Sequence, residues 1–163
     1  MLLIPILPFM ILLASILGQG YINIVITIAI FSWPGIARMV RAQVLSLKER
    51  DYVEAARALG ASNRRIMFKH ILPQLLPLMM ALTLIRVGGA MITEASLSFL
   101  GLGDPTNKSW GAMIYWAKNS GAISSGLWWW ITAPGIMITI TVLGFTQIGY
   151  AIEEYLNPRL KRM

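Results

Sequence analysis

Two charged residues within an apolar stretch are the first candidates for chemistry in this sequence. Arg86 and Glu94 belong to the stretch 74–95, which is otherwise mostly apolar or small. A charge in hydrocarbon is costly, so both side chains should face protein or water and find partners. One interpretation makes them the lining or gate of a path for a polar substrate, with Glu94 as the gate because it lies nearer the predicted outer surface. The other makes them an interhelical salt bridge that fixes helix register.

Hydroxyl side chains give a second, weaker set of candidates. Threonines recur every seven residues in the stretch 127–151. Such a stripe most often hydrogen-bonds to neighbouring helices, and lining a polar path is the alternative. Taken together, the candidate path or gate residues are Arg86, Thr93, Glu94, Thr139 and Thr146.

Other catalytic chemistry has little support in the sequence. His70 is the single histidine and cysteine is absent, so neither a metal cluster nor a disulfide framework is expected. We interpret His70 as a packing and hydrogen-bonding residue rather than a proton switch or metal ligand. The phosphate-binding pattern Gly-x-x-x-x-Gly-Lys-Ser/Thr and the nucleophile pattern Gly-x-Ser-x-Gly do not occur. We therefore expect no catalytic residue and no bound cofactor. An integral membrane enzyme, the alternative, should show titratable residues clustered at one depth.

The elements that position these residues are predicted to be membrane-spanning helices. Of the 163 residues, 56% are hydrophobic and 13% charged, and the mean hydropathy is +0.65. A helix needs roughly 20 apolar residues to cross a bilayer. We predict an all-α, multi-pass bundle in one domain, 1–163, with four spans. The spans are 1–17, 21–44, 74–95 and 127–151. They are separated by the charged segment 46–73 and by a loop, 96–126, that is rich in Gly, Ser and aromatic residues. A cleaved signal peptide is the alternative for the first stretch, but no Lys or Arg precedes it.

Basic residues predict the orientation of these spans. The net charge of +7 comes largely from Lys and Arg between spans two and three and in the C-terminal tail. Beside apolar spans this bias is an orientation signal rather than a nucleic-acid-binding surface, so no nucleic-acid partner is expected. The segment 46–73 and the C-terminus are predicted to be cytoplasmic, in a chain that crosses the cell membrane. Trp128, Trp129 and Trp130 then begin the last span where an outer aromatic belt belongs.

The segment 46–73 reads as two short helices joined by a tight turn. Ser46 with Glu49 fits a capping box that opens a helix reaching Leu59. Gly60 suits the left-handed position that closes a helix. Ser62 then caps a second helix, which Pro73 should end or bend. Sequence physics leaves open whether this hairpin docks a partner or is an amphipathic connector on the membrane surface.

The order of residues in this hairpin resembles a known motif. Glu54-Ala55-Ala56, then Gly60, then Leu72-Pro73 resembles the EAA loop of ABC importer permeases, the membrane subunits that dock a separate ATPase. His70-Ile71-Leu72-Pro73 resembles the dipeptide, oligopeptide and nickel branch of that family, as do 93–103 and Asn157-Pro158-Arg159. The resemblance is specific to the second-permease type and covers nearly the whole chain. The ATPase-coupling residues that it implies are Glu54, Ala55, Ala56, Ala58, Leu59, Gly60, Leu72 and Pro73.

The resemblance also implies partners and a cargo. The expected partners are ABC ATPase subunits that bind ATP and magnesium, a second permease subunit, an extracytoplasmic substrate-binding protein and membrane lipid. Short peptides are the expected cargo, with nickel or small oligosaccharides as alternatives. The family's members have six spans, so the first span here corresponds to their third and the chain is expected to be N-terminally shortened. A remnant that binds the ATPase for assembly or regulation, without transport, is the alternative function.

Overall fold

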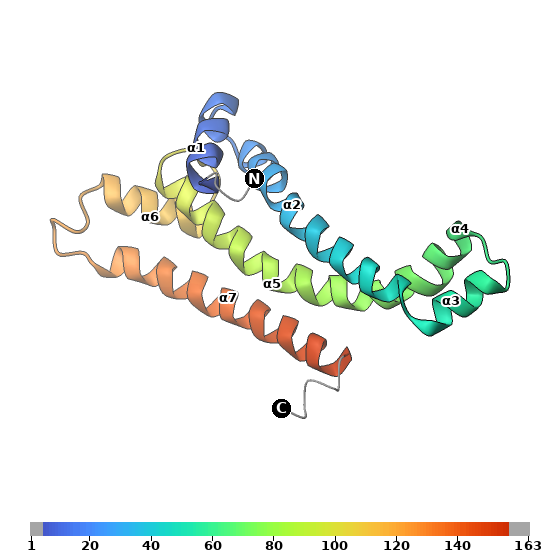
Figure 1. Ribbon diagram of the computed structural model, residues 1–163. Helices are drawn as coiled ribbons and strands as arrows, with labels where there is room; N and C mark the ends of the chain where they lie inside the picture. The colour runs from blue at the N-terminus through green and yellow to red at the C-terminus, as the bar shows by residue number, and fades with distance from the viewer. Residues whose placement is uncertain (1–4, 157–163) are drawn as a thin grey trace. The chain divides into compact units, whose positions relative to one another are not determined.

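The chain folds into helices joined by short connections (Figure 1). The computed structural model describes residues 5–156, and among these there is no β-strand. The all-α prediction is therefore confirmed for the described part of the chain. The elements are α1 (Ile6–Leu17), α2 (Tyr21–Lys48), α3 (Asp51–Ala58), α4 (Asn63–Arg65), the π-helical segment η1 (Ile66–Ile71), α5 (Leu72–Phe99), α6 (Trp110–Asn119) and α7 (Trp129–Leu156).

Three helices in the described residues are long and apolar enough to cross a membrane. They are Tyr21–Lys48, the continuous helix Asn63–Phe99 and Trp129–Tyr155. Their large apolar side chains are mostly exposed within this single chain, as expected for helices that face lipid or a partner rather than water. Three of the four predicted spans thus have matching helices, each longer than predicted.

The first predicted span, 1–17, is only partly matched. Its described part is α1, a helix of 12 residues, which is shorter than the three long helices. Pro5 precedes this helix in an extended conformation, and Gly18 ends it with a φ of +83°. Residues 1–4 lie outside the described part of the chain, as do Asn157, Pro158 and Arg159 of the C-terminal tail.

The chain divides into two compact units, and each is described by itself. Unit 1 comprises residues up to Ser32 together with Arg86–Phe145, and unit 2 comprises Trp33–Ile85 with the residues from Thr146 onward. The division between the units falls inside α2, α5 and α7. The predicted single domain is neither confirmed nor contradicted by this division.

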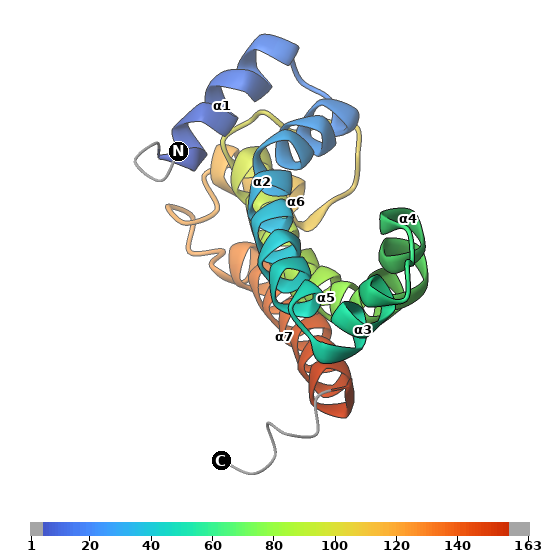
Figure 2. The ribbon, with the colours of Figure 1, turned by 45° about the vertical axis from the view of Figure 1, so that its right-hand side comes forward.

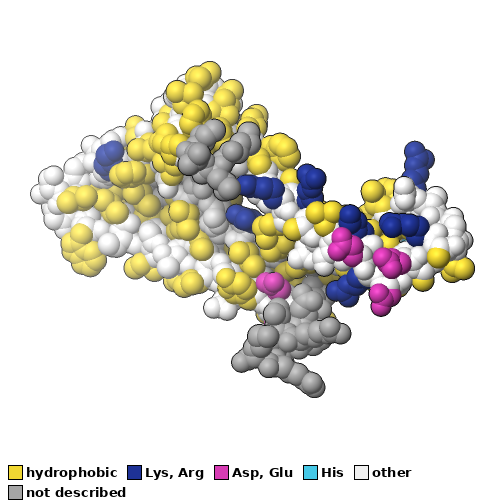
Figure 3. Space-filling model, in the orientation of Figure 1, with side chains coloured by type: hydrophobic (Ala, Val, Ile, Leu, Met, Phe, Trp, Pro, Cys, Tyr) yellow, Lys and Arg dark blue, Asp and Glu magenta, His cyan; other side chains and the backbone are white. Residues whose placement is uncertain are grey.

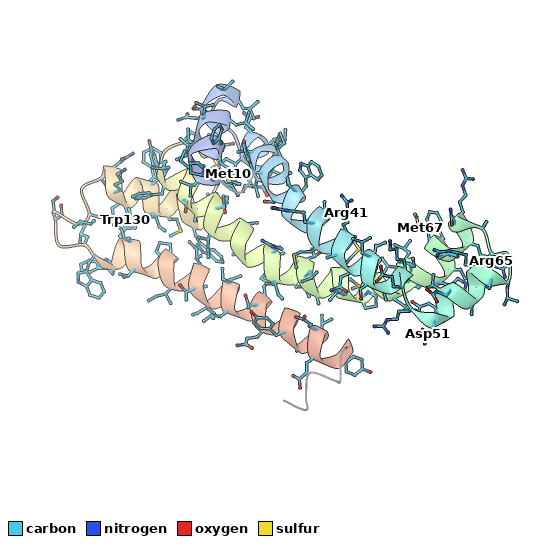
Figure 4. All side chains as sticks on the ribbon, in the orientation of Figure 1. Met10, Arg41, Asp51, Arg65, Met67 and Trp130 are labelled. Carbon is cyan, nitrogen blue, oxygen red and sulfur yellow. The ribbon has the colours of Figure 1, made fainter. Side chains whose placement is uncertain are left out.

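Unit 1 holds together around a small apolar core and one long-range polar contact. Met10 of α1, Ile24 of α2 and Leu97 of α5 are buried against one another. Figure 4 labels Met10 on α1 within this group of side chains. The side-chain amide of Gln19 donates to the carbonyl oxygen of Gly101 at 2.9 Å. Together these contacts join the α1–α2 connection to the end of α5.

Unit 1 also contains a helix that the sequence analysis missed. The segment 96–126 was expected to be a loop, but α5 continues to Phe99 and α6 runs from Trp110 to Asn119. Ser109 caps α6, because its hydroxyl accepts a hydrogen bond from the N–H of Ala112 at 3.1 Å. The prediction of a loop between spans did not include this helix.

Unit 2 has a larger apolar core at the junction of its helices. Leu47, Val53, Ile66, Ile71 and Leu75 are buried together, and they come from α2, α3, η1 and α5. In the same unit α7 packs against α5 at Gly149, where an added Cβ would lie 2.6 Å from Cγ1 of Ile85 and 3.1 Å from the carbonyl oxygen of Ala81. A side chain at this glycine would therefore force the two helices apart.

Candidate functional site

The first candidate site is the polar hairpin, defined here as residues 51–71 (α3, α4 and η1). Both ribbon views place α3 and α4 side by side (Figures 1 and 2). In Figure 4 the labelled Asp51 begins the first helix, α3. The labelled Arg65 and Met67 belong to the second half of the hairpin, in α4 and η1. Charged side chains gather over this region in the space-filling view (Figure 3).

The turn of the hairpin is a helix-closing motif that needs a glycine. Gly60 has a φ of +80°, a left-handed conformation that favours glycine. Its N–H donates to the carbonyl of Arg57, and the N–H of Ala61 donates to the carbonyl of Ala56, both at 3.0 Å. This pair of bonds is the Schellman motif, which satisfies carbonyls left open at the end of α3. The predicted left-handed, helix-closing conformation of Gly60 is confirmed, whereas its part in ATPase coupling stays a prediction.

The entry to the hairpin differs from the prediction. Ser46 was expected to cap the first helix with Glu49, but α2 continues through Ser46 to Lys48, so this prediction was wrong. The helix that follows begins at Asp51, after the extended residue Arg50, which makes no side-chain cap. Burial of Leu47 in the core of unit 2 favours continuation of α2, because the apolar pattern outweighs a local cap signal.

The second half of the hairpin joins α5 without a break. The hydroxyl of Ser62 accepts a hydrogen bond from the N–H of Arg65 at 3.4 Å, as predicted for a cap. The chain then passes through the π-helical segment η1 directly into α5. The helix does not end at Pro73, so that part of the prediction was wrong, and a bend at Pro73 stays a prediction. Because proline has no backbone N–H, Pro73 donates no helical hydrogen bond at the junction of η1 and α5.

The hairpin buries Val53, Ile66 and Ile71, and most of the predicted coupling residues are exposed. Val53 is fully buried at 0% exposure, whereas Leu59 at the tip is 89% exposed. His70 packs near Tyr52, with 6.5 Å between the ring centroids. Of the predicted coupling residues, the exposed ones are Glu54, Ala55, Ala58, Leu59, Gly60 and Pro73, and the half-buried ones are Ala56 and Leu72.

These positions form two separate groups along the chain. Residues 54–60 cover α3 and the tip of the hairpin, whereas Leu72 and Pro73 begin α5. The first group combines a carboxylate, small alanines and one exposed leucine. Such a surface can accept the close approach of another backbone and pair with a basic residue.

The second candidate site surrounds Glu94 in unit 1. The Oε1 atom of Glu94 accepts hydrogen bonds from the hydroxyls of Ser98 at 2.7 Å and Ser109 at 2.9 Å. Ser98 is on α5, one turn from Glu94, and Ser109 caps α6. Glu94 therefore connects the end of α5 with the start of α6 through its carboxylate. Neither serine was predicted from the sequence as a partner of Glu94, although Ser98 lies only four residues away.

A pocket of about 450 Å³ opens beside this carboxylate. We call it the α5–α6 pocket, and all of its lining residues belong to unit 1. Its wall combines one carboxylate and one ammonium group with apolar and aromatic side chains. The lining residues are Met91, Glu94, Lys108, Ser109, Trp110, Met113 and Ile138.

The other predicted path residues are not gathered in this pocket. The hydroxyls of Thr93 and Thr139 each donate to a carbonyl four residues back in their own helix, at Gly89 and Gly135. Both of these donated bonds lie within one helix, and bonding to neighbouring helices or lining a path stays a prediction for these two residues. Arg86 is exposed and Thr146 is half-buried. Their roles in a path stay predictions.

The loop before α6 carries a carboxylate with an altered acidity. The hydroxyl and the N–H of Thr106 both donate to Oδ1 of Asp104, at 2.6 and 2.8 Å. These hydrogen bonds favour the charged form, so the side-chain bond from Thr106 and then its backbone bond lower the pKa of Asp104. The N–H of Asn107 also donates to the carbonyl oxygen of Asp104 at 3.2 Å, so residues 104–107 form a small turn before Lys108. Residues 5–156 contain no group of three or more His, Cys, Asp or Glu side chains that could hold a metal ion.

Known proteins resemble the chain over nearly its whole length. The family described as "Binding-protein-dependent transport system inner membrane component" matches residues 1–162. A Brucella ovis protein named as a peptide permease protein is 38% identical over 157 residues, which is 96% of this chain and 52% of that protein. The glutathione transport system permease protein of Pectobacterium atrosepticum is 40% identical over 148 residues, 90% of this chain and 48% of that protein. The chain thus spans about half the length of these relatives.

Proposed function

The chain belongs to the family of binding-protein-dependent transport system inner membrane components, and from this premise we propose that it is a permease subunit of an ATP-driven importer. Its three long apolar helices fit the membrane location of that family. The observation that carries the proposal is the polar hairpin, an exposed, structured element that continues directly into the long helix Asn63–Phe99.

In the proposed mechanism, ATPase subunits dock on the tip of the hairpin. Glu54 offers an exposed carboxylate for a basic residue of the ATPase, and Leu59 offers an apolar contact. The Schellman turn at Gly60 and the buried Val53 keep this tip in one conformation. Closure of the ATPase subunits on ATP would displace the hairpin, and the continuous helix would carry that displacement into the membrane. ATP and magnesium bind to the partner in this scheme.

The proposed orientation places the hairpin and the C-terminus in the cytoplasm. Its support is the concentration of Lys and Arg between α2 and α5, compared with Lys108 and Lys118 in the segment 96–126. The segment 96–126, with the α5–α6 pocket, then faces outward. There it would meet a substrate-binding protein, and a second permease subunit would complete the path through the membrane.

The proposed cargo is a short peptide. The named relatives support this choice, since one is named a peptide permease protein and another a glutathione transport system permease protein. Glutathione is itself a peptide of three residues. Nickel as cargo has weaker support, because residues 5–156 contain no cluster of three potential metal ligands.

Co-purification with ABC ATPase subunits tests the docking proposal. The Glu54→Lys variant reverses an exposed charge on α3 and should reduce ATPase capture at least about tenfold, the loss expected for a charge-assisted hydrogen bond. Glu49→Lys makes the same charge change outside the hairpin and serves as the matched control. Equal capture by wild type and both variants would contradict docking through this surface.

Cysteine labelling tests the orientation separately. The chain has no cysteine, so a single introduced thiol is unambiguous. Asn63→Cys at the exposed start of α4 should react with an impermeant maleimide only after the membrane is opened. Ser124→Cys, exposed between α6 and α7, should react in intact spheroplasts. Labelling in the reverse order would place the hairpin outside and exclude ATPase docking there.

A further inference from the structure

The α5–α6 pocket holds two opposite charges that do not neutralise each other. Glu94 and Lys108 both line it, yet within the described part of the chain no ion pair joins them. Oε1 of Glu94 already accepts two serine hydroxyls, which orient the carboxylate. Its second oxygen, Oε2, accepts no hydrogen bond from residues 5–155, so it is available to a ligand.

The rest of the pocket wall is suited to an apolar body between two charged ends. Trp110, Met113, Met91 and Ile138 surround the charged groups with apolar surface. The volume of about 450 Å³ falls within the range of small-ligand pockets, which run from about 300 to 1,000 Å³. A carboxylate and an ammonium group in one such pocket match a ligand that carries both charges in the opposite sense.

We propose that the α5–α6 pocket is a binding site for zwitterionic short peptides. The N-terminal ammonium group donates to Oε2 of Glu94, and the C-terminal carboxylate accepts from the ammonium group of Lys108. The side chains of the peptide lie against Trp110 and Met113. This inference rests on the proposed importer function, which it extends by naming a peptide-recognition site within the permease itself.

Phosphatidylethanolamine offers related chemistry, because its headgroup also joins an ammonium group to an anion. The two ligands differ in one respect that an experiment can use, since the peptide is water-soluble and the headgroup is part of the bilayer. We commit to the peptide, because Lys108 lies in the loop before α6 rather than within a membrane-length helix.

Peptide binding to the full chain in lipid nanodiscs tests the inference. Nanodiscs of phosphatidylcholine and phosphatidylglycerol contain no primary amine, and trialanine is titrated by calorimetry. We expect N-acetylated trialanine to bind at least about tenfold more weakly than trialanine, because acetylation removes the ammonium charge. Glu94→Gln should weaken trialanine to a similar extent, while its remaining amide oxygen still accepts the serine hydroxyls. Lys108→Gln should weaken trialanine but not C-terminally amidated trialanine.

Controls separate this inference from the importer function. Glu49→Gln, an exposed carboxylate outside the pocket, should leave trialanine binding unchanged. The Glu94→Gln variant should still capture the ATPase, because Glu94 lies outside the hairpin. If the wild-type chain itself captures no ATPase, the result contradicts the importer function and not the peptide site. Absence of trialanine binding, or equal binding of its N-acetylated form, would overturn the peptide site. Loss of trialanine binding in nanodiscs that contain phosphatidylethanolamine would also overturn it, because the headgroup would then be the occupant.

Discussion

Replacing Gly111 with alanine should separate α6 from α5 in unit 1. A Cβ at Gly111 would lie 2.7 Å from Cα of Ala95 and 2.8 Å from Cβ of Ser98, with the carbonyl oxygen of Ala95 at 3.2 Å. Two of these three atoms are backbone atoms of α5, so no side-chain rotation relieves the contact. The helix α6 must therefore move away from α5 to admit even one methyl group.

The magnitude follows from this geometry. Adding a methyl group to a well-packed site typically costs about 1–3 kcal/mol, and an immovable backbone neighbour favours the upper half of that range. Movement of α6 also stretches the bond between Ser109 and Glu94, which is 2.9 Å long in the native structure. A hydrogen bond to a charged group contributes about 1.5–3 kcal/mol. We expect Gly111→Ala to lower the free energy of unfolding by about 2–4 kcal/mol, since the two losses are partly shared.

Unfolding of the full chain in detergent micelles, followed by tryptophan fluorescence, measures this effect. Gly89→Ala on α5 is the matched control, because a Cβ there meets no atom within 4 Å. In a helix interior that change should be neutral or stabilise by about 0.5–1 kcal/mol. If the two variants unfold within about 0.5 kcal/mol of each other, the close packing of α6 on α5 is not what stabilises this region.

Three further predictions concern single side chains. Ser109→Ala removes the bond to Glu94 and the cap of α6, so the first turn of α6 should exchange its amide hydrogens faster and stability should fall by about 0.5–2 kcal/mol; unchanged exchange would refute the cap. Gly60→Ala meets no neighbouring atom within 4 Å, so its cost is purely conformational, about 1–2 kcal/mol, and hydrogen exchange should rise across the hairpin; equal protection would argue against the strained turn. The depressed pKa of Asp104 means that its turn contributes stability at neutral pH, and this stability is lost as the pH falls through that pKa. In the Thr106→Val variant the pKa of Asp104 should rise towards its ordinary value, because the hydroxyl donor is removed. Carboxyl NMR titration measures this pKa, and an unchanged titration would contradict the assigned cause.

Local signals explain which parts of the hairpin could be predicted from sequence. Gly60 and Ser62 act on backbone groups within five residues, and both were predicted correctly. Ser46 and Glu49 carry an equally good local signal, yet α2 continues past Ser46. The reason is tertiary, because Leu47 is buried against residues of α3, η1 and α5 that the local sequence does not reveal.

The Glu94 site shows a similar limit. The sequence indicated that a charge in an apolar stretch needs a partner, but it identified none for Glu94. The structure supplies hydroxyls, from Ser98 and from Ser109, which is 15 residues away. The second serine could not be predicted as a partner, because the helix α6 that it caps was not predicted within the loop. The buried residues of α6 are small ones, Gly111, Ala112 and Ala117, and small residues give only a weak helical periodicity in a hydropathy pattern.

Ser98 takes part in both a hydrogen bond and close packing at the end of α5. Together these contacts should make the end of α5 and α6 move as one rigid body within unit 1. The hydroxyl of Ser98 donates to Glu94. The Cβ of Ser98 would lie 2.8 Å from a Cβ added at Gly111, and its Oγ would lie 2.5 Å from a Cβ added at Gly103, so neither glycine has room for a side chain. Any change in the separation of these helices would break the polar link and open a void at the glycines at the same time. We therefore expect α6 to move together with the end of α5 in a transport cycle. The shape of the α5–α6 pocket should then change when other elements approach it, and not because α5 and α6 separate.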